Sequence, residues 1–144
     1  MKENPIHNTQ TIEEAITTAI NFTLKSDNIK IVEDSIVDNL QQNYAKISFK
    51  NDLNDEIILI GNSENINKFL NNNDKNSNIS LSILGETLNL ITAYISKKLN
   101  LLGYKLDITP PEFGIVDKEL LQRISDRKQL HISVDDMELF YIIL

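Results

Sequence analysis

The segment at residues 82–94, SILGETLNLITAY, holds the side chains of this sequence that are best suited to chemistry. Glu86 and Asn89 lie three positions apart in it, and Gly85 precedes the glutamate. A carboxamide has both a donor and an acceptor and can hold a water molecule, while a carboxylate can pair with a basic group. Residues at i and i+3 share one face of a helix, so both side chains can reach a single object in a partner. Gly85 costs about 1 kcal/mol relative to alanine inside a helix, which suggests that something approaches the backbone closely there.

The spacing of the pair carries little information by itself. The chain has ten glutamates and 18 asparagines among 144 residues, so chance alone supplies about 1.3 pairs of the form Glu-x-x-Asn. The sequence contains two, Glu86/Asn89 and Glu64/Asn67. On spacing alone, a solvated helix face is the favoured interpretation over a functional site.

Length and composition limit the possible functions. A chain of 144 residues fits one domain over residues 1–144, of which residues 1–10 are polar and expected to be flexible. The absence of cysteine excludes disulfides, thiolate zinc sites and thiol nucleophiles. His7 lies in the polar N-terminal stretch and His131 in a strand-like run where a structural role is expected. We therefore expect neither histidine-based catalysis nor a metal site.

The charge pattern and the hydropathy also exclude classes of partner. The net charge is −7, and no run of Lys or Arg exceeds two residues, as at Lys97-Lys98. Binding of a nucleic acid needs a basic patch, so no nucleic-acid partner is expected. The N-terminus has no apolar signal region, and no apolar run approaches membrane-spanning length. The sequence therefore predicts a cytoplasmic protein without a membrane partner.

Hydrophobic periodicity predicts an α+β fold, an antiparallel-rich sheet with two long helices packed on one face. The expected elements are a helix at 11–25 with Thr11 as N-cap, an extended segment at 28–37, strands at 44–49 and 56–60, a short helix at 63–70 capped by Ser63, a loop at 71–78, a long helix at 79–102 closed by Gly103, a strand at 105–109 stopped by Pro110-Pro111, a helix at 117–128, and a hairpin of 130–134 and 138–144 around Asp135-Asp136.

The long helix is expected to have three faces, because a helix turns by about 100° per residue. The core stripe comprises Leu81, Leu84, Leu88, Ile91, Ile95 and Leu99. A second face, called the polar ridge below, points away from it and comprises Ser82, Glu86, Asn89, Ala93 and Lys97. The third is an apolar flank of Ile83, Leu90 and Tyr94, which must meet another helix, a second subunit or a partner.

Residues 82–111, SILGETLNLITAYISKKLNLLGYKLDITPP, resemble the active-site segment of the CheX and CheC chemotaxis phosphatases. That family has Ser or Asp, three residues, Glu, two residues, Asn, and a proline roughly two dozen residues later. Ser82, Glu86, Asn89 and Pro110 or Pro111 match this pattern, as do the Gly-Glu pair and the LGY helix exit. Glu64/Asn67 lacks this context. The CheC branch carries a second Glu/Asn pair on its first helix, which is absent from TIEEAITTAINF here, so the arrangement is CheX-like.

The resemblance implies hydrolysis of the aspartyl phosphate on a CheY-type response regulator. Asn89 would hold the attacking water, and Glu86 would pair with the regulator's active-site lysine. The resemblance also implies partner contacts at Ser82, Gly85, Leu90, Ala93 and Lys97. It implies no cofactor of the chain's own, because the regulator would supply the magnesium ion.

Two alternatives stay open at this point. The chain could be a catalytically silent CheX-like binding and dimerisation module, or a structural dimer domain of another fold whose ridge is merely solvated. The resemblance implies a homodimer. The C-terminal run ELFYIIL is apolar on both faces, so Leu139 to Leu144 is expected either at or near a subunit interface, continuing a sheet or packing beneath it, or in a central strand buried within one subunit.

Overall fold

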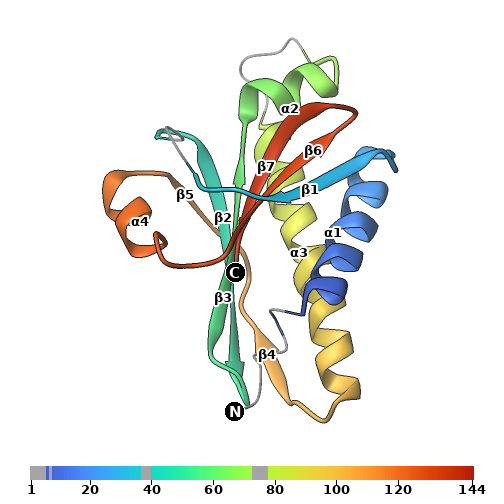
Figure 1. Ribbon diagram of the computed structural model, residues 1–144, viewed down its shortest axis with the longest axis vertical. Coiled ribbons are helices and arrows are strands. Elements are labelled where there is room, and N and C mark those ends of the chain that lie inside the picture. Colours follow the sequence, from blue (N-terminus) through green and yellow to red (C-terminus); the bar gives the residue numbers. More distant parts are fainter. Residues whose placement is uncertain (1–5, 7, 37–39, 73–77) are drawn as a thin grey trace.

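The computed structural model describes residues 6, 8–36, 40–72 and 78–144 of the chain. Its centre is a sheet of seven strands in the order β1-β6-β7-β3-β2-β4, with β5 also paired to β2 (Figure 1). Every pairing is antiparallel. The bounds are α1 Thr9–Leu24, β1 Ile29–Glu33, β2 Asn43–Asn51, β3 Asp55–Gly61, α2 Ser63–Phe69, α3 Ile79–Leu101, β4 Leu106–Ile108, β5 Glu112–Ile115, α4 Lys118–Arg123, β6 Gln129–Val134 and β7 Met137–Ile143.

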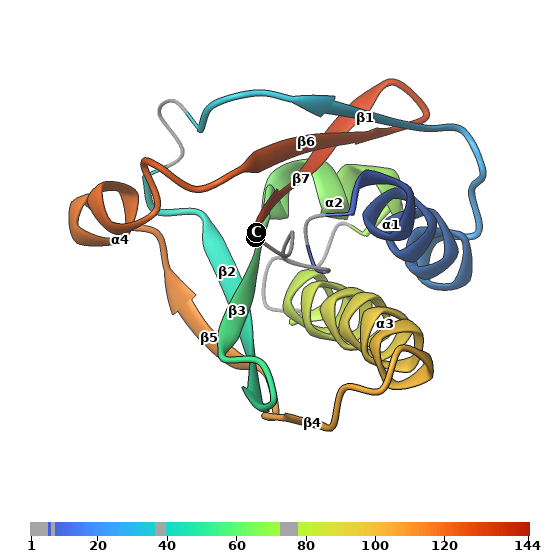
Figure 2. The same cartoon turned by 60° about the horizontal axis from the view of Figure 1, so that its bottom comes forward.

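The two long helices, α1 and α3, lie together on one face of the sheet, which bends around them (Figure 2). Strand β2 shows why: its alternate residues Ala45, Ile47 and Phe49 are buried on the helix side, the period-2 pattern of a strand with one face on a core. These residues join one large apolar cluster with the inner faces of both helices. The predicted fold class is confirmed.

Helix α3 is long and apolar enough, by length and composition alone, to cross a membrane. Half of its apolar window is buried inside the molecule. It is the core helix of this fold, with one side against the sheet and another against α1.

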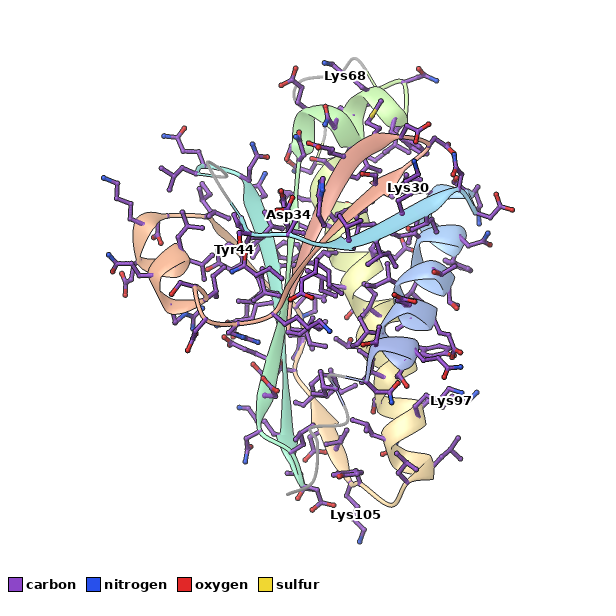
Figure 3. All side chains as sticks on the ribbon, in the orientation of Figure 1. Lys30, Asp34, Tyr44, Lys68, Lys97 and Lys105 are labelled. Atoms are coloured by element: carbon purple, nitrogen blue, oxygen red, sulfur yellow. The ribbon has the colours of Figure 1, made fainter. Side chains whose placement is uncertain are left out.

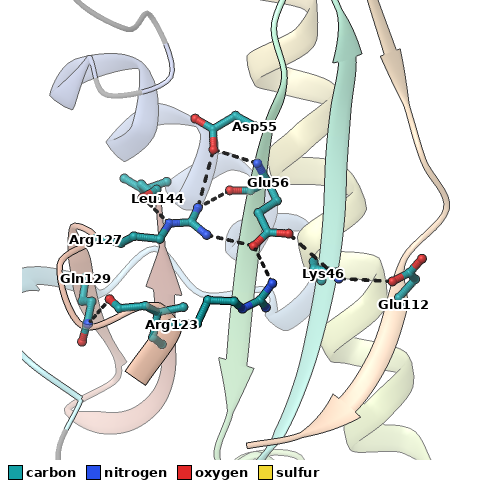
Figure 4. Close-up of polar contacts among 9 residues, drawn as sticks. Lys46, Asp55, Glu56, Glu112, Arg123, Arg127, Gln129 and Leu144 are labelled. Atoms are coloured by element: carbon teal, nitrogen blue, oxygen red, sulfur yellow. Dashed lines mark hydrogen bonds and ion pairs between the residues drawn. The ribbon is translucent and has the colours of Figure 1, made fainter. Parts of the chain in front are cut away.

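The opposite face of the sheet carries a smaller apolar cluster covered by α4, and a polar network ties this layer together (Figure 4). The guanidinium of Arg127 donates to Glu56 Oε1 at 3.0 Å, to the Glu56 carbonyl, and through Nε to the carbonyl of Leu144 at 3.0 Å. The Glu56 carboxylate also forms ion pairs with Arg123, at 3.4 Å, and with Lys46, at 3.9 Å. The segment after α4 is therefore fixed to strand β3 and to the last residue of the chain.

Most predicted elements are present, and several boundaries differ. The α1 helix begins earlier than expected, because Asn8 rather than Thr11 is its N-cap and accepts from the Thr11 backbone N–H at 3.1 Å. Asn62 rather than Ser63 caps α2 in the same way. Asparagine is at least as good an N-cap as either hydroxyl residue, so the preceding residue prevails. Gly103 follows α3 with φ of 95°, which confirms the predicted helix end.

Two further points differ from the expectation. The helix predicted at 117–128 ends at Arg123, because Arg127 turns back to bind Glu56 and Leu144. Strand β5 follows the proline pair, where no strand was predicted. Residues 1–5 and 7, including His7, lie outside the described residues, so the flexibility expected for residues 1–10 stays a prediction; of the remainder, Ile6 is buried and the Asn8 side chain caps α1.

The C-terminal strand lies in the middle of the sheet. β7 pairs with β6 on one side and with β3 on the other, around a turn in which Asp135 and Asp136 both have positive φ. The hairpin is confirmed, and the edge placement of residues 139–144 is wrong. A strand that is apolar on both faces fits a central position, where each face is covered.

Replacing Arg127 tests how much the polar network around Glu56 contributes to the stability of the fold. Replacing it by alanine leaves a half-buried carboxylate and two carbonyl groups without their donor, so we expect a loss of about 2–3 kcal/mol in the free energy of unfolding. Arg123→Ala is the matched control, because Arg123 is half exposed and makes a single longer contact with Glu56. It should cost less than about 1 kcal/mol. Urea unfolding measures both, and equal losses would show that the network has no special role.

Candidate active site

Helix α3 is held in one rotational setting by its apolar side. Leu84, Leu88, Ile91, Ile95 and Leu99 are each at most 2% exposed and belong to the main core. Leu81, the remaining member of the predicted core stripe, is partly exposed at the start of the helix. The core stripe is thus confirmed for five of its six residues.

The polar ridge emerges on the outer side of α3 as predicted. Ser82, Glu86, Asn89, Ala93 and Lys97 are all exposed. In Figure 3 the Lys97 side chain points away from the sheet. The geometric part of the expectation, that Glu86 and Asn89 share an exposed face, is confirmed.

The side chains of Glu86 and Asn89 are not engaged within the chain. Among the described residues, neither makes a hydrogen bond or an ion pair through its side chain. The Asn89 carbonyl accepts from Thr92 Oγ1 at 3.1 Å, but this is a backbone group of the helix. Both functional groups are therefore available to a partner.

The second Glu-x-x-Asn pair is used locally. On α2, Lys68 donates to Glu64 at 3.1 Å in an i, i+4 ion pair. The side chain of Asn67 accepts from Asn72 Nδ2 at 3.2 Å at the end of the same helix. The two pairs have the same spacing, and the structure distinguishes them by what each side chain already contacts.

Helix α1 covers the apolar flank of α3. Thr87 Oγ1 donates to Thr23 Oγ1 at 3.1 Å, and the Tyr94 hydroxyl donates to Glu14 Oε2 at 2.7 Å. Ile83 and Leu90 pack against the core partly buried. The apolar flank thus meets another helix, which is one of the three possibilities named for it. Of the residues predicted to contact a partner, Gly85 is buried and Leu90 is partly buried, whereas the others are exposed.

One pair of titratable groups lies beside the polar ridge. The hydrogen bond from Tyr94 lowers the pKa of the Glu14 carboxyl, with a further contribution from Gln10, and the same bond raises the pKa of Tyr94. The ammonium of Lys98 lies 5.5 Å from the centre of the Tyr94 ring. Because the pKa of Glu14 is lowered, this contact supports the folded state above the carboxyl's unfolded pKa and is lost as the pH falls.

Gly85 contacts the chain itself. A Cβ atom at this position would lie 2.7 Å from Cζ of Phe113, so the tip of that ring rests on the helix backbone. The close approach that the glycine predicted is therefore made by β5. Gly85 is buried, and any partner contact at this point would be made by Phe113.

Within the described residues, no group of three or more Asp, Glu or His side chains could hold a metal ion. His131 lies on the sheet face opposite the helices, stacked on Tyr141 with ring centres 4.5 Å apart. Its Nε2 atom is buried without a hydrogen bond, 3.9 Å from Glu138 at a small pocket. The polar ridge therefore has no ligand set of its own for a magnesium ion.

No protein-family model matches the sequence, and a search of curated proteins finds no match. Solved structures do match. A chain of the CheX–CheY–BeF3–Mg²⁺ complex from Borrelia burgdorferi has a TM-score of 0.68 at 19% identity over 96% of each chain. A CheC-like superfamily protein from Shewanella sp. PV-4 has a TM-score of 0.63 at 14% identity, over 99% of this chain and 98% of the other. FliY from Thermotoga maritima has a TM-score of 0.60 at 16% identity, over 100% of this chain and 92% of the other.

The chain has the fold of CheX and CheC-like chemotaxis proteins. This agrees with the resemblance drawn from residues 82–111. At such identities the likeness establishes the fold, and the function has to be argued from the site.

Phe113 is the residue at this site that sequence reasoning missed. Its strand of four residues follows Pro110-Pro111, and such a short segment has no periodicity of its own. The sequence EFGI could have indicated this strand, because its apolar residues Phe113 and Ile115 are separated by one residue, as on one face of a strand.

Proposed function

We propose that this protein is a phosphatase that hydrolyses the aspartyl phosphate of a CheY-type response regulator in chemotaxis signalling. One observation carries the proposal. On the CheX-type fold, Glu86 and Asn89 share the exposed face of α3 with their functional groups unengaged, while the equally spaced pair on α2 is bonded locally.

The proposed reaction needs little from this chain beyond positioning. Phosphoryl transfer has a loose transition state, so catalysis depends on alignment of the nucleophile and on neutralisation of charge. The oxygen of a water molecule attacks phosphorus, the bond to the aspartyl oxygen breaks, and inorganic phosphate and a free carboxylate result. The Asn89 carboxamide accepts a hydrogen bond from this water and donates toward the phosphoryl group, which holds the water in line.

Glu86 has the second role, that of fixing the docked pose. Its carboxylate pairs with a lysine of the regulator's active site, a charge-assisted contact that sets the distance from Asn89 to phosphorus. Magnesium is held by the regulator. No covalent intermediate forms on this chain.

A catalytically silent binding module remains the second candidate, because the same fold occurs outside CheX. A chain of the FliM–SpeE complex from Helicobacter pylori has a TM-score of 0.62 at 11% identity, over 99% of this chain and 89% of the other. Hydrolysis of a phosphorylated receiver domain separates the two candidates: release of phosphate above the regulator's own rate supports the phosphatase, and binding without release supports the module.

Asn89→Ala tests the mechanism directly. The side chain is exposed and makes no hydrogen bond to any residue that the structure describes, so the variant should unfold at the parent's temperature. We expect turnover to fall by about a hundredfold or more, because the water loses its orientation. The measurement is phosphate release from a phosphorylated receiver domain.

Asn67→Ala is the matched control for that variant, since it removes the same carboxamide from the other Glu-x-x-Asn pair. Its turnover should equal that of the parent. Normal turnover in Asn89→Ala would exclude the proposed mechanism.

Glu86→Ala should act mainly on docking. Loss of a charge-assisted interface contact costs a few kcal/mol if the pair is desolvated and less if it stays wet, so the Kd for the phosphorylated receiver domain should rise and turnover should fall with it. Glu86→Lys should bind more weakly still, because it places two cations together. If Glu86→Lys binds as well as the parent, the pairing with lysine is wrong.

We further propose that the protein is a cytoplasmic homodimer. Light scattering at micromolar concentration should give twice the chain mass of 16.5 kDa. A single-chain mass with full phosphatase activity would contradict the dimer. The central position of β7 excludes only a dimer in which this strand pairs with a second chain along a sheet edge.

A further inference from the structure

We propose that Phe113, held against α3 by Gly85, is a docking residue for the receiver domain that brings its phosphoaspartate to Asn89. This inference rests on the proposed function and extends the site from α3 to strand β5. It assigns a partner contact that no pattern in the sequence indicated.

The position of the ring follows from the strand register. Phe113 is paired with Ala45 of β2, and directly opposed residues of two strands point to the same face of the sheet. Ala45 is buried on the helix side, so Phe113 also points toward α3. There its ring tip occupies the space that a side chain at residue 85 would fill, 2.7 Å from the position of a Cβ atom.

This places the ring at the border of the polar ridge. Gly85 precedes Glu86 directly and lies four residues before Asn89, and residues at i and i+4 are neighbours on a helix surface, about 5–6 Å apart. The ring therefore touches α3 about one helical turn from the carboxamide. Helix α1 lies along the other flank of the ridge, at Thr87 and Tyr94.

Contact with α3 uses only part of the ring. The Phe113 side chain remains 51% exposed, and Ile115, two positions along the strand and on the same face, is 61% exposed. Together they form an apolar strip beside a polar ridge. Buried aromatic anchors surrounded by polar groups are typical of the energetically important parts of protein interfaces.

The occupant follows from the size of the partner. A domain of about 100 residues has a radius of gyration near 13 Å, and a standard interface covers about 800 Å² on each partner. A receiver domain that places its phosphoryl group at Asn89 must therefore extend over a surface only one helical turn away. Leu101, another exposed apolar residue, lies twelve residues along α3 from Asn89, about 18 Å at 1.5 Å per residue.

The contact between Gly85 and Phe113 has a function beyond covering the helix. A purely structural role would affect the stability of the protein and leave its affinity for the receiver domain unchanged. A docking role predicts the reverse, because a half-exposed ring contributes little to the fold and gains most of its burial in the complex.

The test uses the full chain and a CheY-type receiver domain in two forms. The receiver domain phosphorylated by a small-molecule phosphodonor is the substrate from which kcat and KM are measured. The receiver domain activated with beryllofluoride and Mg²⁺ is the ligand whose Kd is measured by calorimetry. Phe113→Ala should raise KM and Kd about tenfold and leave kcat within twofold of the parent. Phe113→Gln keeps part of the side-chain volume over Gly85, and it should likewise raise KM and Kd while kcat stays close to that of the parent. Leu101→Ala, an exposed apolar residue far along the helix, should match the parent in all three constants.

Gly85→Ala provides an independent variant. The added methyl group displaces the ring tip, and the half-exposed ring can swing outward, so the fold should persist while Kd rises. In the double variant Gly85→Ala/Phe113→Ala the ring is already gone, so Kd should be no higher than in Phe113→Ala alone. Additive effects of the two changes would contradict this positioning role.

The outcomes separate the inference from the proposed function. Unchanged KM and Kd in Phe113→Ala, together with lost turnover in Asn89→Ala, would overturn the docking role and leave the phosphatase intact. A parent that binds the receiver domain without hydrolysis would overturn the phosphatase, while the Kd of the variants would still decide the docking role. A parent that neither binds nor hydrolyses would overturn both.

Discussion

The rotational setting of α3 is the constraint on which the site depends. Five leucine and isoleucine side chains on one stripe of this helix are almost fully buried. Burying each stabilises the fold by about 1.5–3 kcal/mol, so turning the helix by a single residue, about 100°, would remove much of that stabilisation. Because the stripe is fixed against the sheet, the opposite side of the helix is fixed as well. Glu86 and Asn89 are therefore directed outward by residues on the other side of the same helix.

The two flanks of α3 are covered by contacts of different kinds. On one side α1 adds two side-chain hydrogen bonds, Thr87 to Thr23 and Tyr94 to Glu14. On the other side β5 lays Phe113 across Gly85, a contact that needs the absence of a side chain. Between these flanks the polar ridge remains exposed. The boundaries of the candidate site thus follow from packing on both sides, and the fold leaves one narrow face for a partner.

The local pattern of the sequence predicts those parts of the fold whose signal lies within one element. The long helix has about six turns of consistent periodicity by the 3.6-residue repeat, and the hairpin has two strands around Asp135-Asp136, so both are predicted correctly. Strand β5 has four residues and exists because β2 pairs with it, which is information from elsewhere in the chain. The position of β7 was left open between a subunit interface and a central strand for a similar reason: its apolar character on both faces is clear in the sequence, but its neighbours are set by the sheet order. The resemblance over residues 82–111 identified Glu86 and Asn89, whereas Phe113 became visible only through its contact with Gly85.

A rigid helix face is sufficient for the proposed chemistry because the partner supplies the rest. The scissile acyl phosphate, the metal ion and the lysine all belong to the receiver domain in this mechanism, so this chain needs neither a deep pocket nor a ligand cluster. What it must supply is a carboxamide held at a fixed distance from phosphorus, and small errors of position are costly in such a reaction. A backbone fixed in the core meets that requirement, and only the few side-chain torsions of Glu86 and Asn89 need to be ordered on binding. Each ordered side chain costs about 0.5–1.5 kcal/mol, which a charge-assisted contact and an apolar contact at the border of the ridge can offset. An anchor such as Phe113 can therefore help to hold the complex, while Asn89 needs only to orient the water.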